Sequence, residues 1–501
     1  MSQNQNNDIE HLLNNLSDNF NHSKEIAIIL AAGHGKRIKS QRSKMLHKIW
    51  EIPTVERVYS ACKDGIPDCN TIVVVGIKAS DVMSVIGKRN SNKFAFQKEQ
   101  MGTGHAVQTA MSVIPKNQDF DTVYVLPGDM GLLDADTMKM FKEDFLNSHY
   151  DMMVLTGVYT GDPLKNYYGR IVRVKEKTID GKSSGEDFGK VIEIIEYKDI
   201  LALKDDSLYT VEYRNKKYGF TKSELLEINE YNSGVYAFKF DKLNQLINKL
   251  SSNNAQNEIY ITDLIYIFNQ HGYSVGAVSP ENDYVVMGFN DKAVLKEMEA
   301  IARRKIFDRL KNIIEISDPD DFFIHEDVVK RIEEMDKKGI PLDISLDKGV
   351  YIGKNVKLNY NNHFGRAVFI DGNVVLGENV RLQNMVHLSC FPNQQLIIGN
   401  NVEILWSDII KGNIQIGDNS RIESSVNITG SDEYPTRIGK NVLIKGTSYL
   451  FGTVVEDGVF IEHSVLIRKK IRAVKDENGN IRPVRFYVPI PEGADLVRDI
   501  R

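Results

Sequence analysis

The sequence predicts a chain in two parts, an α/β domain with a largely parallel sheet followed by a parallel β-helix. In residues 24–290, short apolar runs rich in β-branched residues alternate with longer stretches of helical spacing. Strands that alternate with helices are typical of βαβ units, which build parallel sheets. After residue 346, pairs of an aliphatic residue and a glycine open hexapeptide blocks, and such repeats are typical of stacked β-helix coils.

Four apolar runs are the candidate strands of the first part. They cover residues 26–30, 71–75, 122–126 and 152–156. Residues 54–62 and 104–113, which lie between them, have the spacing of helices. Ligands of such sheets bind where the carboxyl ends of strands meet helix N-termini, so we expect the site in the loops that follow these runs.

The hexapeptide repeat depends on five aliphatic–glycine pairs. They are Ile352-Gly353, Leu376-Gly377, Ile398-Gly399, Ile416-Gly417 and Ile438-Gly439. The step from Gly399 to Gly417 fits three hexapeptides, which is one full coil, and the other steps are longer. We therefore expect small loops within some coils. The repeat ends near Arg468, and the stretch around Glu477-Asn-Gly-Asn480 predicts a polar hairpin or arm.

Domain boundaries follow from these changes. Residues 291–312 have the apolar spacing of one amphipathic helix, and residues 313–346 contain the breakers Asp318-Pro319 and Ile340-Pro341. The segments that we expect are a flexible N-terminal tail or one loose helix (1–23), the α/β domain (24–290), a linker helix and connector (291–346), the β-helix (347–468) and a C-terminal arm (469–501).

The composition excludes several classes of protein. Lys and Arg total 63 against 68 Asp and Glu, so no global basic field would attract nucleic acid. Three cysteines form neither a metal-ligand spacing nor a disulfide framework, which suits a reducing cytoplasm. No apolar stretch approaches the roughly 18–20 residues that span a bilayer, and the Asn-rich N-terminus lacks the pattern of a signal peptide. We expect a soluble cytoplasmic protein without nucleic-acid or membrane partners.

Residues 30–47 (LAAGHGKRIKSQRSKMLH) are the most informative segment. Gly33 and Gly35 follow a predicted strand, and a basic cluster comes next: Lys36, Arg37, Lys39, Arg42 and Lys44. Glycines let backbone N–H groups approach a phosphate, and Arg37 and Lys44 can neutralise a triphosphate. The alternative is an ordinary tight turn between a strand and a helix. No Walker pattern is present, because no Gly-Lys-Ser/Thr follows four residues after a glycine.

This segment resembles the signature of the sugar-nucleotide pyrophosphorylases, Leu-Ala-Ala-Gly-x-Gly-Thr-Arg-Met followed by Pro-Lys-x-Leu. Further segments resemble the N-acetylglucosamine-1-phosphate uridylyltransferase domain of the bifunctional bacterial uridylyltransferase/acetyltransferase. In chain order they are Gln97-Lys-Glu-Gln-Met-Gly-Thr-Gly-His-Ala-Val107, Leu126-Pro-Gly-Asp-Met130, Tyr168-Gly-Arg-Ile-Val172, Ile195-Glu-Tyr-Lys-Asp199, Glu230-Tyr-Asn-Ser-Gly-Val-Tyr236, Asn253-Asn-Ala-Gln256 with Tyr260-Ile-Thr-Asp-Leu264, and Gly288-Phe-Asn290.

The resemblance implies a Rossmann-like nucleotidyltransferase domain with a mixed, mostly parallel sheet, followed by a left-handed β-helix. It implies transfer of a uridylyl group from UTP to N-acetylglucosamine 1-phosphate with Mg²⁺. The implied nucleotide-binding residues are Leu30, Ala31, Ala32, Gly33, Gln97, Gly102 and Thr103, with Arg37 and Lys44 as catalytic residues. The implied sugar-binding residues are Gly169, Glu196 and Asn232. The implied metal ligands are Asp129 and Asn290.

Elementary chemistry agrees with these roles. A hard cation near phosphates prefers oxygen ligands and keeps several waters, so one carboxylate and one amide oxygen suffice. The attacking phosphate oxygen is already a nucleophile, so no general base is needed. Plainer interpretations remain open: Asp129 as a turn residue, Glu196 and Asn232 as strand-end residues, and His47 and His105 as packing residues rather than acids or bases.

The sequence also departs from the family pattern. Lys36 stands where the family has Thr, Pro127 replaces a Tyr, and Gly131 replaces a Pro. Ser43 stands where the family has Pro, which frees the φ angle and is expected to loosen the loop that holds Lys44. The first Gly of Gly-Tyr-Gly is lacking, and insertions lie around residues 175–187 and 201–223.

The C-terminal part lacks the family's His-Leu-x-Tyr-Leu-Gly-Asp and Asn-Ile-Gly-Ala-Gly-Thr segments, and nothing around His387 or His463 matches them. We therefore expect no acetyl transfer and a β-helix that serves assembly, since related β-helices form trimers. Three alternatives stay open: a pyrophosphorylase for another sugar 1-phosphate or nucleotide, a catalytically silent sensor or scaffold, and a bifunctional enzyme.

Overall fold

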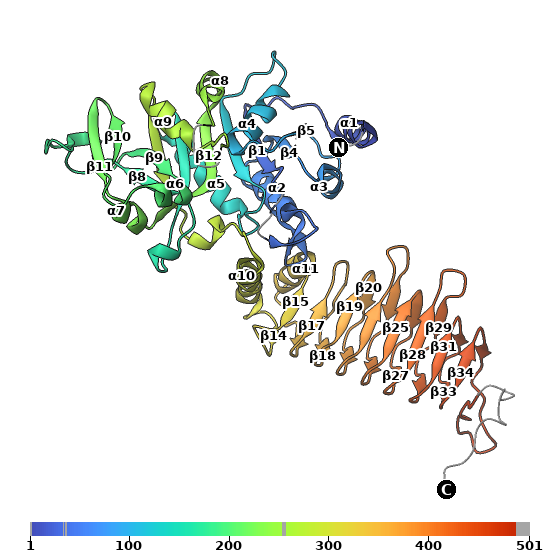
Figure 1. The fold of residues 1–501 in the computed structure, drawn as a ribbon. Coiled ribbons are helices and arrows are strands. Elements are labelled where there is room, and N and C mark those ends of the chain that lie inside the picture. Colours follow the sequence, from blue (N-terminus) through green and yellow to red (C-terminus); the bar gives the residue numbers. More distant parts are fainter. Residues whose placement is uncertain (1–2, 34, 36–37, 253–256, 487–501) are drawn as a thin grey trace, which may run out of the picture. The chain divides into compact units, whose positions relative to one another are not determined.

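The computed structural model describes residues 3–33, 35, 38–252 and 257–486. The chain divides into two compact units, Met1–Glu299 and Ala300–Arg501, and each is described by itself (Figure 1). No helix among the described residues is both long and apolar enough to cross a membrane.

Unit 1 is built on a nine-stranded sheet with the order β13-β7-β12-β6-β1-β4-β5, extended by β8 and β9. Strand β1 is parallel to both of its neighbours, whereas β12 runs antiparallel between β6 and β7. The predicted mixed, mostly parallel sheet is confirmed. The strands are β1 (Glu25–Ala31), β4 (Asn70–Val75), β5 (Asn92–Phe96), β6 (Thr122–Pro127), β7 (Met152–Val158), β8 (Arg170–Arg173), β9 (Val191–Ile195), β12 (Glu230–Lys239) and β13 (Val275–Val278).

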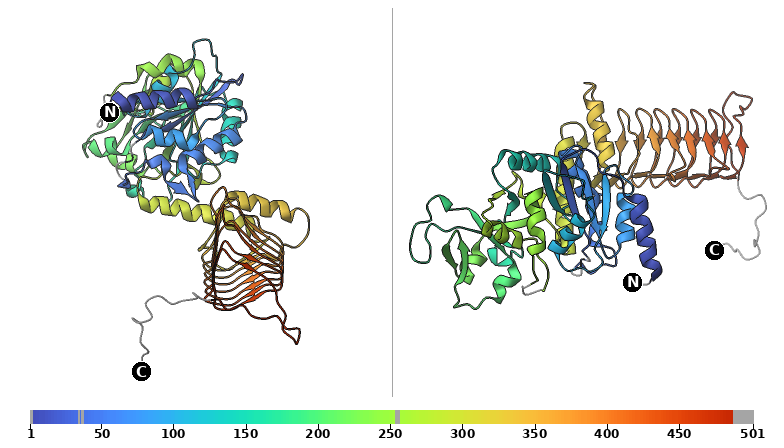
Figure 2. Two further views of the ribbon diagram at one scale, coloured as in Figure 1. Left: turned by 90° about the vertical axis from the view of Figure 1, so that its right-hand side faces the viewer. Right: turned by 90° about the horizontal axis from the view of Figure 1, so that it is seen from above.

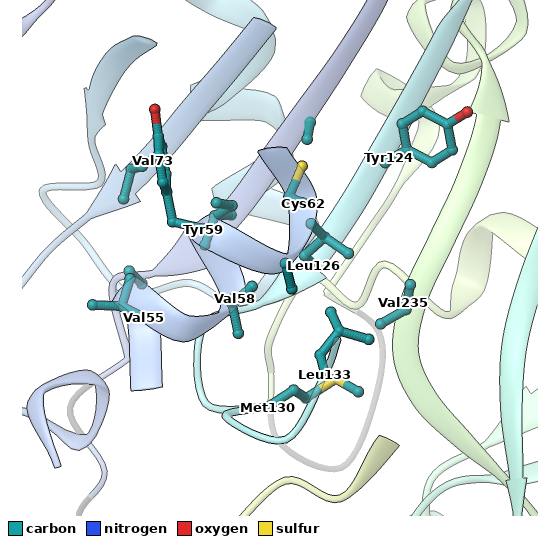
Figure 3. Packing of buried hydrophobic residues seen from close by; sticks show 14 of the residues in the cluster. Val55, Val58, Tyr59, Cys62, Val73, Tyr124, Leu126, Met130, Leu133 and Val235 are labelled. Carbon is teal, nitrogen blue, oxygen red and sulfur yellow. The ribbon is translucent and has the colours of Figure 1, made fainter. Parts of the chain in front are cut away.

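Helices cover both faces of this sheet. Alternate residues of β1 divide between two cores: Ala27 and Ile29 belong to one, and Ile26 and Ile28 to the other, because successive side chains of a strand point to opposite faces. Figure 3 shows the first core, where Val58 of α2 lies among strand residues. The helices of this face are α2 (Thr54–Gly65), α3 (Ala79–Ile86) and α5 (Ala135–Asn147), and those of the other are α4 (Thr103–Ser112), α8 (Phe240–Leu246) and α9 (Asp263–Gln270).

Of the two possibilities for the N-terminal segment, a flexible tail or one helix, the structure has the helix. The segment contains helix α1 (Gln3–Leu16), in which Ile9 is buried in the same core cluster as α2. Leu12, Leu13 and Leu16 pack against that cluster. These positions follow the i, i+3, i+4, i+7 spacing of an amphipathic helix, a pattern that the many Asn residues obscured.

The expected insertion at residues 201–223 adds a hairpin with its own small core. Strands β10 and β11 pair antiparallel, and Val211 and Tyr218 are buried together with Leu225. The remaining short elements of unit 1 are β2 (Lys48–Ile49), β3 (Ile52–Pro53), α6 (Tyr197–Ala202), β10 (Tyr209–Tyr213), β11 (Lys216–Phe220), α7 (Lys222–Glu227) and the 3₁₀ turns η2 (Lys44–Leu46), η3 (Pro163–Lys165), η4 (Gly185–Asp187), η5 (Ile247–Lys249) and η6 (Asp283–Val286).

Helix α10 (Lys292–Leu310) matches the helix expected over residues 291–312 and contains the boundary between the units. The connector expected after it is instead the start of the β-helix. Strands β14 (Glu315–Ile316) and β15 (Phe322–Ile324) already pair with later coils, and α11 (Glu326–Asp336) follows β15 before the next coil begins at β16 (Ser345–Leu346). The sequence hid these first coils because they lack aliphatic–glycine pairs and contain prolines.

Three parallel sheets form the faces of the left-handed β-helix, which confirms the fold predicted for unit 2 (Figure 2). The first contains β14, β16 (Ser345–Leu346), β18 (His363–Phe364), β21 (Arg381–Leu382), β24 (Glu403–Ile404), β27 (Arg421–Ile422), β30 (Leu443–Ile444) and β33 (Phe460–Ile461). The second contains β15, β17 (Val350–Ile352), β19 (Phe369–Asp371), β22 (His387–Ser389), β25 (Ile409–Gly412), β28 (Asn427–Gly430), β31 (Tyr449–Phe451) and β34 (Val465–Ile467). The third contains β20 (Val374–Leu376), β23 (Leu396–Ile398), β26 (Ile414–Ile416), β29 (Thr436–Ile438), β32 (Val454–Val455) and β35 (Lys470–Ile471).

Four of the five predicted aliphatic–glycine pairs stack in one column. Leu376 pairs with Ile398, which pairs with Ile416, which pairs with Ile438, all in the third sheet, whereas Ile352 belongs to the second sheet. Two of the longer steps, Gly377 to Gly399 and Gly417 to Gly439, contain loops, as expected, and the Asn393 amide donates to Asp432 at 2.6 Å between them. The step from Gly353 to Gly377 contains none, because it is one coil followed by a change of face.

The predicted arm after Arg468 begins with a last strand of the coil, β35. An antiparallel bridge between Lys475 and Ile481 then closes the expected hairpin. Residues 487–501 lie outside the described residues.

Candidate active site

The carboxyl ends of β1 and β6 meet at one edge of the unit 1 sheet. Leu30 is the register partner of Pro127, and the Gly128 N–H donates to the Leu30 carbonyl at 3.0 Å. Asp129 therefore follows directly beside the loop that begins at Ala32. Because β12 runs antiparallel to β6, its first residues, including Asn232, lie at this same edge. This is where an open α/β sheet presents its ligand groups.

The loop after β1 changes from buried to exposed within two residues. Ala31 and Ala32 are buried, and Gly33 is exposed. Gly35 has φ +68°, and a Cβ there would lie 2.7 Å from Cβ of Lys44. Only glycine therefore allows this loop to lie against Lys44. Arg37, the other predicted catalytic residue, lies outside the described residues.

Lys44, Asp129 and Asn290 converge. The Lys44 ammonium forms an ion pair with Asp129 Oδ2 and donates a hydrogen bond of 3.0 Å to Asn290 Oδ1. The side chains of Lys44 and Asp129 are only 12% and 15% exposed. Residues that are far apart in the sequence thus supply one cation with a carboxylate and an amide oxygen.

The loop that carries Asn290 is fixed by two aromatic residues. Phe289 is buried, lies beneath Lys44 with Nζ 5.3 Å from its ring centroid, and meets His47 edge-to-face at 6.0 Å. The Tyr168 hydroxyl donates to the Gly288 carbonyl at 3.0 Å, and its ring stacks on Tyr231 at 4.5 Å. Burial lowers the pKa of His47, with Arg42 and Lys292 adding to the effect.

The oxygen atoms of this cluster fit a hard cation. Asp129 and Asn290 each direct one oxygen atom at the same position, and in this structure the Lys44 ammonium occupies that position. Among the described residues no group of three or more His, Cys, Asp or Glu could hold a metal. A divalent ion at this position would complete its coordination with water and phosphate oxygens, as Mg²⁺ ordinarily does.

Gln97, Gly102 and Thr103 lie together after β5. The buried Gln97 donates from its amide to the Gly102 carbonyl at 3.1 Å. Gly102 has φ +106°, and a Cβ there would lie 2.5 Å from the Ile259 carbonyl. Thr103 begins α4, and its hydroxyl accepts from the Ile261 N–H at 3.2 Å. The structure thus joins two of the motif segments, 97–107 and 260–264.

Gly169, Glu196 and Asn232 form a third group. Strands β8 and β9 are antiparallel, which brings Gly169 beside Glu196: a Cβ on Gly169 would lie 3.2 Å from Glu196 Oε1. The Asn232 N–H donates to the Gly169 carbonyl at 2.9 Å, and its Oδ1 accepts from the Tyr236 hydroxyl at 3.0 Å. The three residues predicted to contact the sugar therefore line one place.

Glu196 is electrostatically unusual. Burial, followed by the nearby carboxylates of Asp199, Asp263 and Glu258, raises its pKa to about 7. A carboxyl group that titrates near neutrality can accept a hydrogen bond from a ligand hydroxyl or donate one.

Sequence reasoning assigned no role to Tyr168, Phe289 or Arg170. Arg170 is fully buried, and its guanidinium donates to the carbonyls of Pro163 and Asn166 at 3.1 and 2.8 Å. It therefore fixes the loop that leads to Gly169. All three residues lie inside the motifs that resemble the family, but nothing in the sequence alone indicated these contacts.

The loosening expected from Ser43 is not reflected in its backbone. Ser43 has φ −55° and ψ 142° and is buried, and proline prefers nearly this φ value. Its hydroxyl has no hydrogen-bond partner within the described parts of the chain.

Comparison with known proteins agrees with this geometry. Residues 27–190 match the model of the MobA-like NTP transferase domain. The bifunctional protein GlmU of Acetivibrio thermocellus is 33% identical over 386 residues, which cover 76% of this chain and 74% of that protein. The bifunctional protein GlmU of Clostridioides difficile is 30% identical over 382 residues, covering 75% and 74%. The chain therefore belongs to the GlmU family and is a nucleotidyltransferase of the UDP-N-acetylglucosamine pyrophosphorylase type.

Proposed function

We propose that this chain transfers the uridylyl group of UTP to N-acetylglucosamine 1-phosphate, giving UDP-N-acetylglucosamine and pyrophosphate, with Mg²⁺ as cofactor. The convergence of Lys44, Asp129 and Asn290 beside the glycine loop after β1 carries this proposal. Membership of the GlmU family supports it. We also propose a cytoplasmic location, which the three free cysteines of this chain suit.

In this proposal each group at the sheet edge has one task. The backbone of Leu30 to Gly33 approaches the phosphates, and Lys44 with Arg37 neutralises them. Gln97, Gly102 and Thr103 face the uracil and ribose. Gly169, Glu196 and Asn232 hold the sugar, and Asp129 and Asn290 hold the metal.

The reaction requires positioning rather than proton transfer. A phosphate oxygen of the sugar 1-phosphate forms a bond to the α-phosphorus of UTP, and the bond from that phosphorus to pyrophosphate breaks. Mg²⁺, when bound, neutralises charge on the triphosphate and favours in-line displacement. Lys44 stabilises the charge that accumulates on the leaving pyrophosphate.

We also propose that the β-helix assembles subunits, as a trimer, and does not transfer acetyl groups. The two histidines without a family match are already engaged. His387 stacks on Phe369 at 4.6 Å and contacts the Ser389 hydroxyl at 3.0 Å, and His463 contacts the Thr447 hydroxyl at 2.9 Å. Each contact engages one ring nitrogen, and the absence of the family's histidine segment is the observation that supports this second proposal.

The test is pyrophosphate release from each nucleoside triphosphate with N-acetylglucosamine 1-phosphate or glucose 1-phosphate, with and without Mg²⁺. We expect Mg²⁺-dependent release with UTP and N-acetylglucosamine 1-phosphate, lost in Asp129→Asn and kept in Asp136→Asn, an exposed control. Preference for another pair of substrates would overturn the assignment of UTP and N-acetylglucosamine 1-phosphate. No turnover with any pair would favour the alternative of a catalytically silent sensor or scaffold. Acetyl-CoA-dependent consumption of glucosamine 1-phosphate would overturn the second proposal.

A further inference from the structure

We propose that in the free enzyme the Lys44 ammonium holds the place of the divalent cation. Metal binding then exchanges one cation for another and releases Lys44 toward the nucleotide phosphates. The inference rests on the proposed function only in taking Asp129 and Asn290 to be metal ligands.

The first argument is geometric. Nζ of Lys44 is bound by both oxygen atoms that the metal would use, Oδ2 of Asp129 and Oδ1 of Asn290. A lysine ammonium is a compact point charge with three donors, which suits it to such a position. The metal and the ammonium cannot occupy it together, since like charges a few ångströms apart repel strongly at low exposure.

The second argument concerns charge balance. The Asp129 side chain is 15% exposed, and a carboxylate in such surroundings is costly when it has no partner. Lys44 supplies that partner and keeps the Asn290 oxygen turned toward the same point. The free enzyme thus holds the metal ligands in place without the metal.

The third argument is that the displaced Lys44 ammonium has an alternative position, beside the glycine loop after β1. Its stem lies against the glycine loop, where the missing Cβ of Gly35 leaves room: such an atom would lie 2.7 to 3.5 Å from Cβ, Cγ and Cδ of Lys44. Nucleotide phosphates at that loop would give the displaced ammonium a new partner. Metal and nucleotide should therefore reinforce each other's binding, by the reciprocity of coupled equilibria.

The experiment measures Mn²⁺ binding to the protein without nucleotide, from the paramagnetic resonance signal of the free ion. We expect Lys44→Met to bind Mn²⁺ at least about tenfold more tightly than the wild type, because it removes one charge-assisted hydrogen bond that competes with the metal. Arg42→Met removes the same charge from an exposed position of the same loop and should change the affinity less than about threefold. With UTP present, the advantage of Lys44→Met should disappear.

A second measurement does not depend on a variant. Amine acylation of the wild-type protein, read residue by residue by mass spectrometry, should label Lys44 faster when Mg²⁺ is added, with the exposed Lys39 as internal reference. Equal Mn²⁺ affinities for Lys44→Met and Arg42→Met, or labelling of Lys44 that Mg²⁺ leaves unchanged relative to Lys39, would overturn the inference.

Neither measurement involves turnover. A protein that shows the exchange but releases no pyrophosphate keeps this inference and loses the proposed function. An active enzyme in which Lys44 does not compete with the metal does the reverse.

Discussion

The strands of the two units are buried in different ways. All six residues of β4 are buried, since helices cover both faces of the unit 1 sheet. In the β-helix, burial alternates, as in β26, where Ile414 and Ile416 are buried and Gln415 is exposed. A strand such as β4 therefore has no position free for a ligand, and the candidate site of unit 1 lies on loops and strand ends. Unit 2 repeats the same inward residues and leaves its outward positions open to change.

The units also differ in how they treat buried polar groups. In unit 1, Lys44 and Asp129 neutralise each other, and Glu196 lies where we propose a substrate. In unit 2, Asp408 is fully buried inside a coil, where Val386 and Val426 occupy the matching positions of the adjacent coils. One of its oxygens, Oδ2, lacks a hydrogen-bond partner in the described residues. We assign Asp408 no function, so replacing its buried carboxyl group with an apolar side chain should stabilise unit 2.

Asp408→Val should give the largest change, a stabilisation of unit 2 by about 4 kcal/mol at pH 8–9. Burial raises the pKa of Asp408 from 3.8 to about 8. The unfolded chain ionises this group first, so stability is full below about pH 4 and falls as the pH rises to about 8. Urea unfolding followed by Trp406 fluorescence in a Trp50→Phe background, at pH 5 and pH 9, measures the change. Glu403→Gln, on an outward position, is the control. Equal pH dependence in Asp408→Val and the wild type would contradict the prediction.

Gly412→Ala should destabilise unit 2 by about 3 kcal/mol or more. Gly412 has φ +105°, and a Cβ there would lie 1.9 Å from the Gly430 carbonyl of the next coil, so both strain and a clash result. Gly87→Ala in unit 1 is the matched control, because Gly87 has φ +67° but no atom within 4 Å of its Cβ position. It should cost only about 1 kcal/mol. Thermal unfolding compares the two, and equal losses would mean that the packing of coils is looser than the geometry indicates.

Glu196→Gln tests whether the buried Glu196 carboxyl group, which destabilises unit 1 at high pH, binds the sugar 1-phosphate. The raised pKa of Glu196, about 7 against an ordinary 4.5, means that stability falls as the pH rises between these values. The variant should be more stable by about 2–3 kcal/mol at pH 8. Unlike Asp408→Val, it should also raise KM for the sugar 1-phosphate about tenfold or more, as loss of a charged hydrogen bond does. Unfolding and steady-state kinetics measure both effects, and an unchanged KM would make Glu196 a structural residue.

Ser43→Pro should have the smallest effect, a stabilisation of about 0.5–1 kcal/mol. The backbone already has a φ that proline accepts, and the buried hydroxyl that would be lost has no partner among the residues described here. Thermal unfolding measures the gain, with Ser40→Pro as a control at a less buried position of the same loop. A loss of stability would show that the loop needs the freedom of Ser43.

The sequence predicted the architecture well where one signal repeats. The wound sheet and the stacked coils follow from apolar runs and from columns such as Leu376, Ile398 and Ile416. It failed for β14 and β15, which were hidden by the absence of glycine pairs. At the Asn-rich start of the chain it left a tail and a helix both open.

For the site, motif order suggested Lys44, Asp129 and Asn290 as candidates, but spacing along the chain could not indicate that Lys44 contacts both of the others. That contact depends on β6 lying beside β1, and on Tyr168 and Phe289 fixing the last loop. The raised pKa of Glu196 was also out of reach, because it depends on three carboxylates brought near by folding.

The register of the β-helix has a consequence for how the two units can evolve. Ile404 stacks on Ile422, three hexapeptides later, and the same step relates Ile410 to Ile428 on the next face of the coil. A duplication or deletion of one coil therefore leaves every remaining column in register, and this unit can lengthen or shorten by whole coils. A strand added between β1 and β6 of the unit 1 sheet would instead move the loops that follow them apart and disrupt the candidate site. The number of coils in unit 2 can therefore change during evolution, whereas the order of the strands in the unit 1 sheet cannot change without loss of the site.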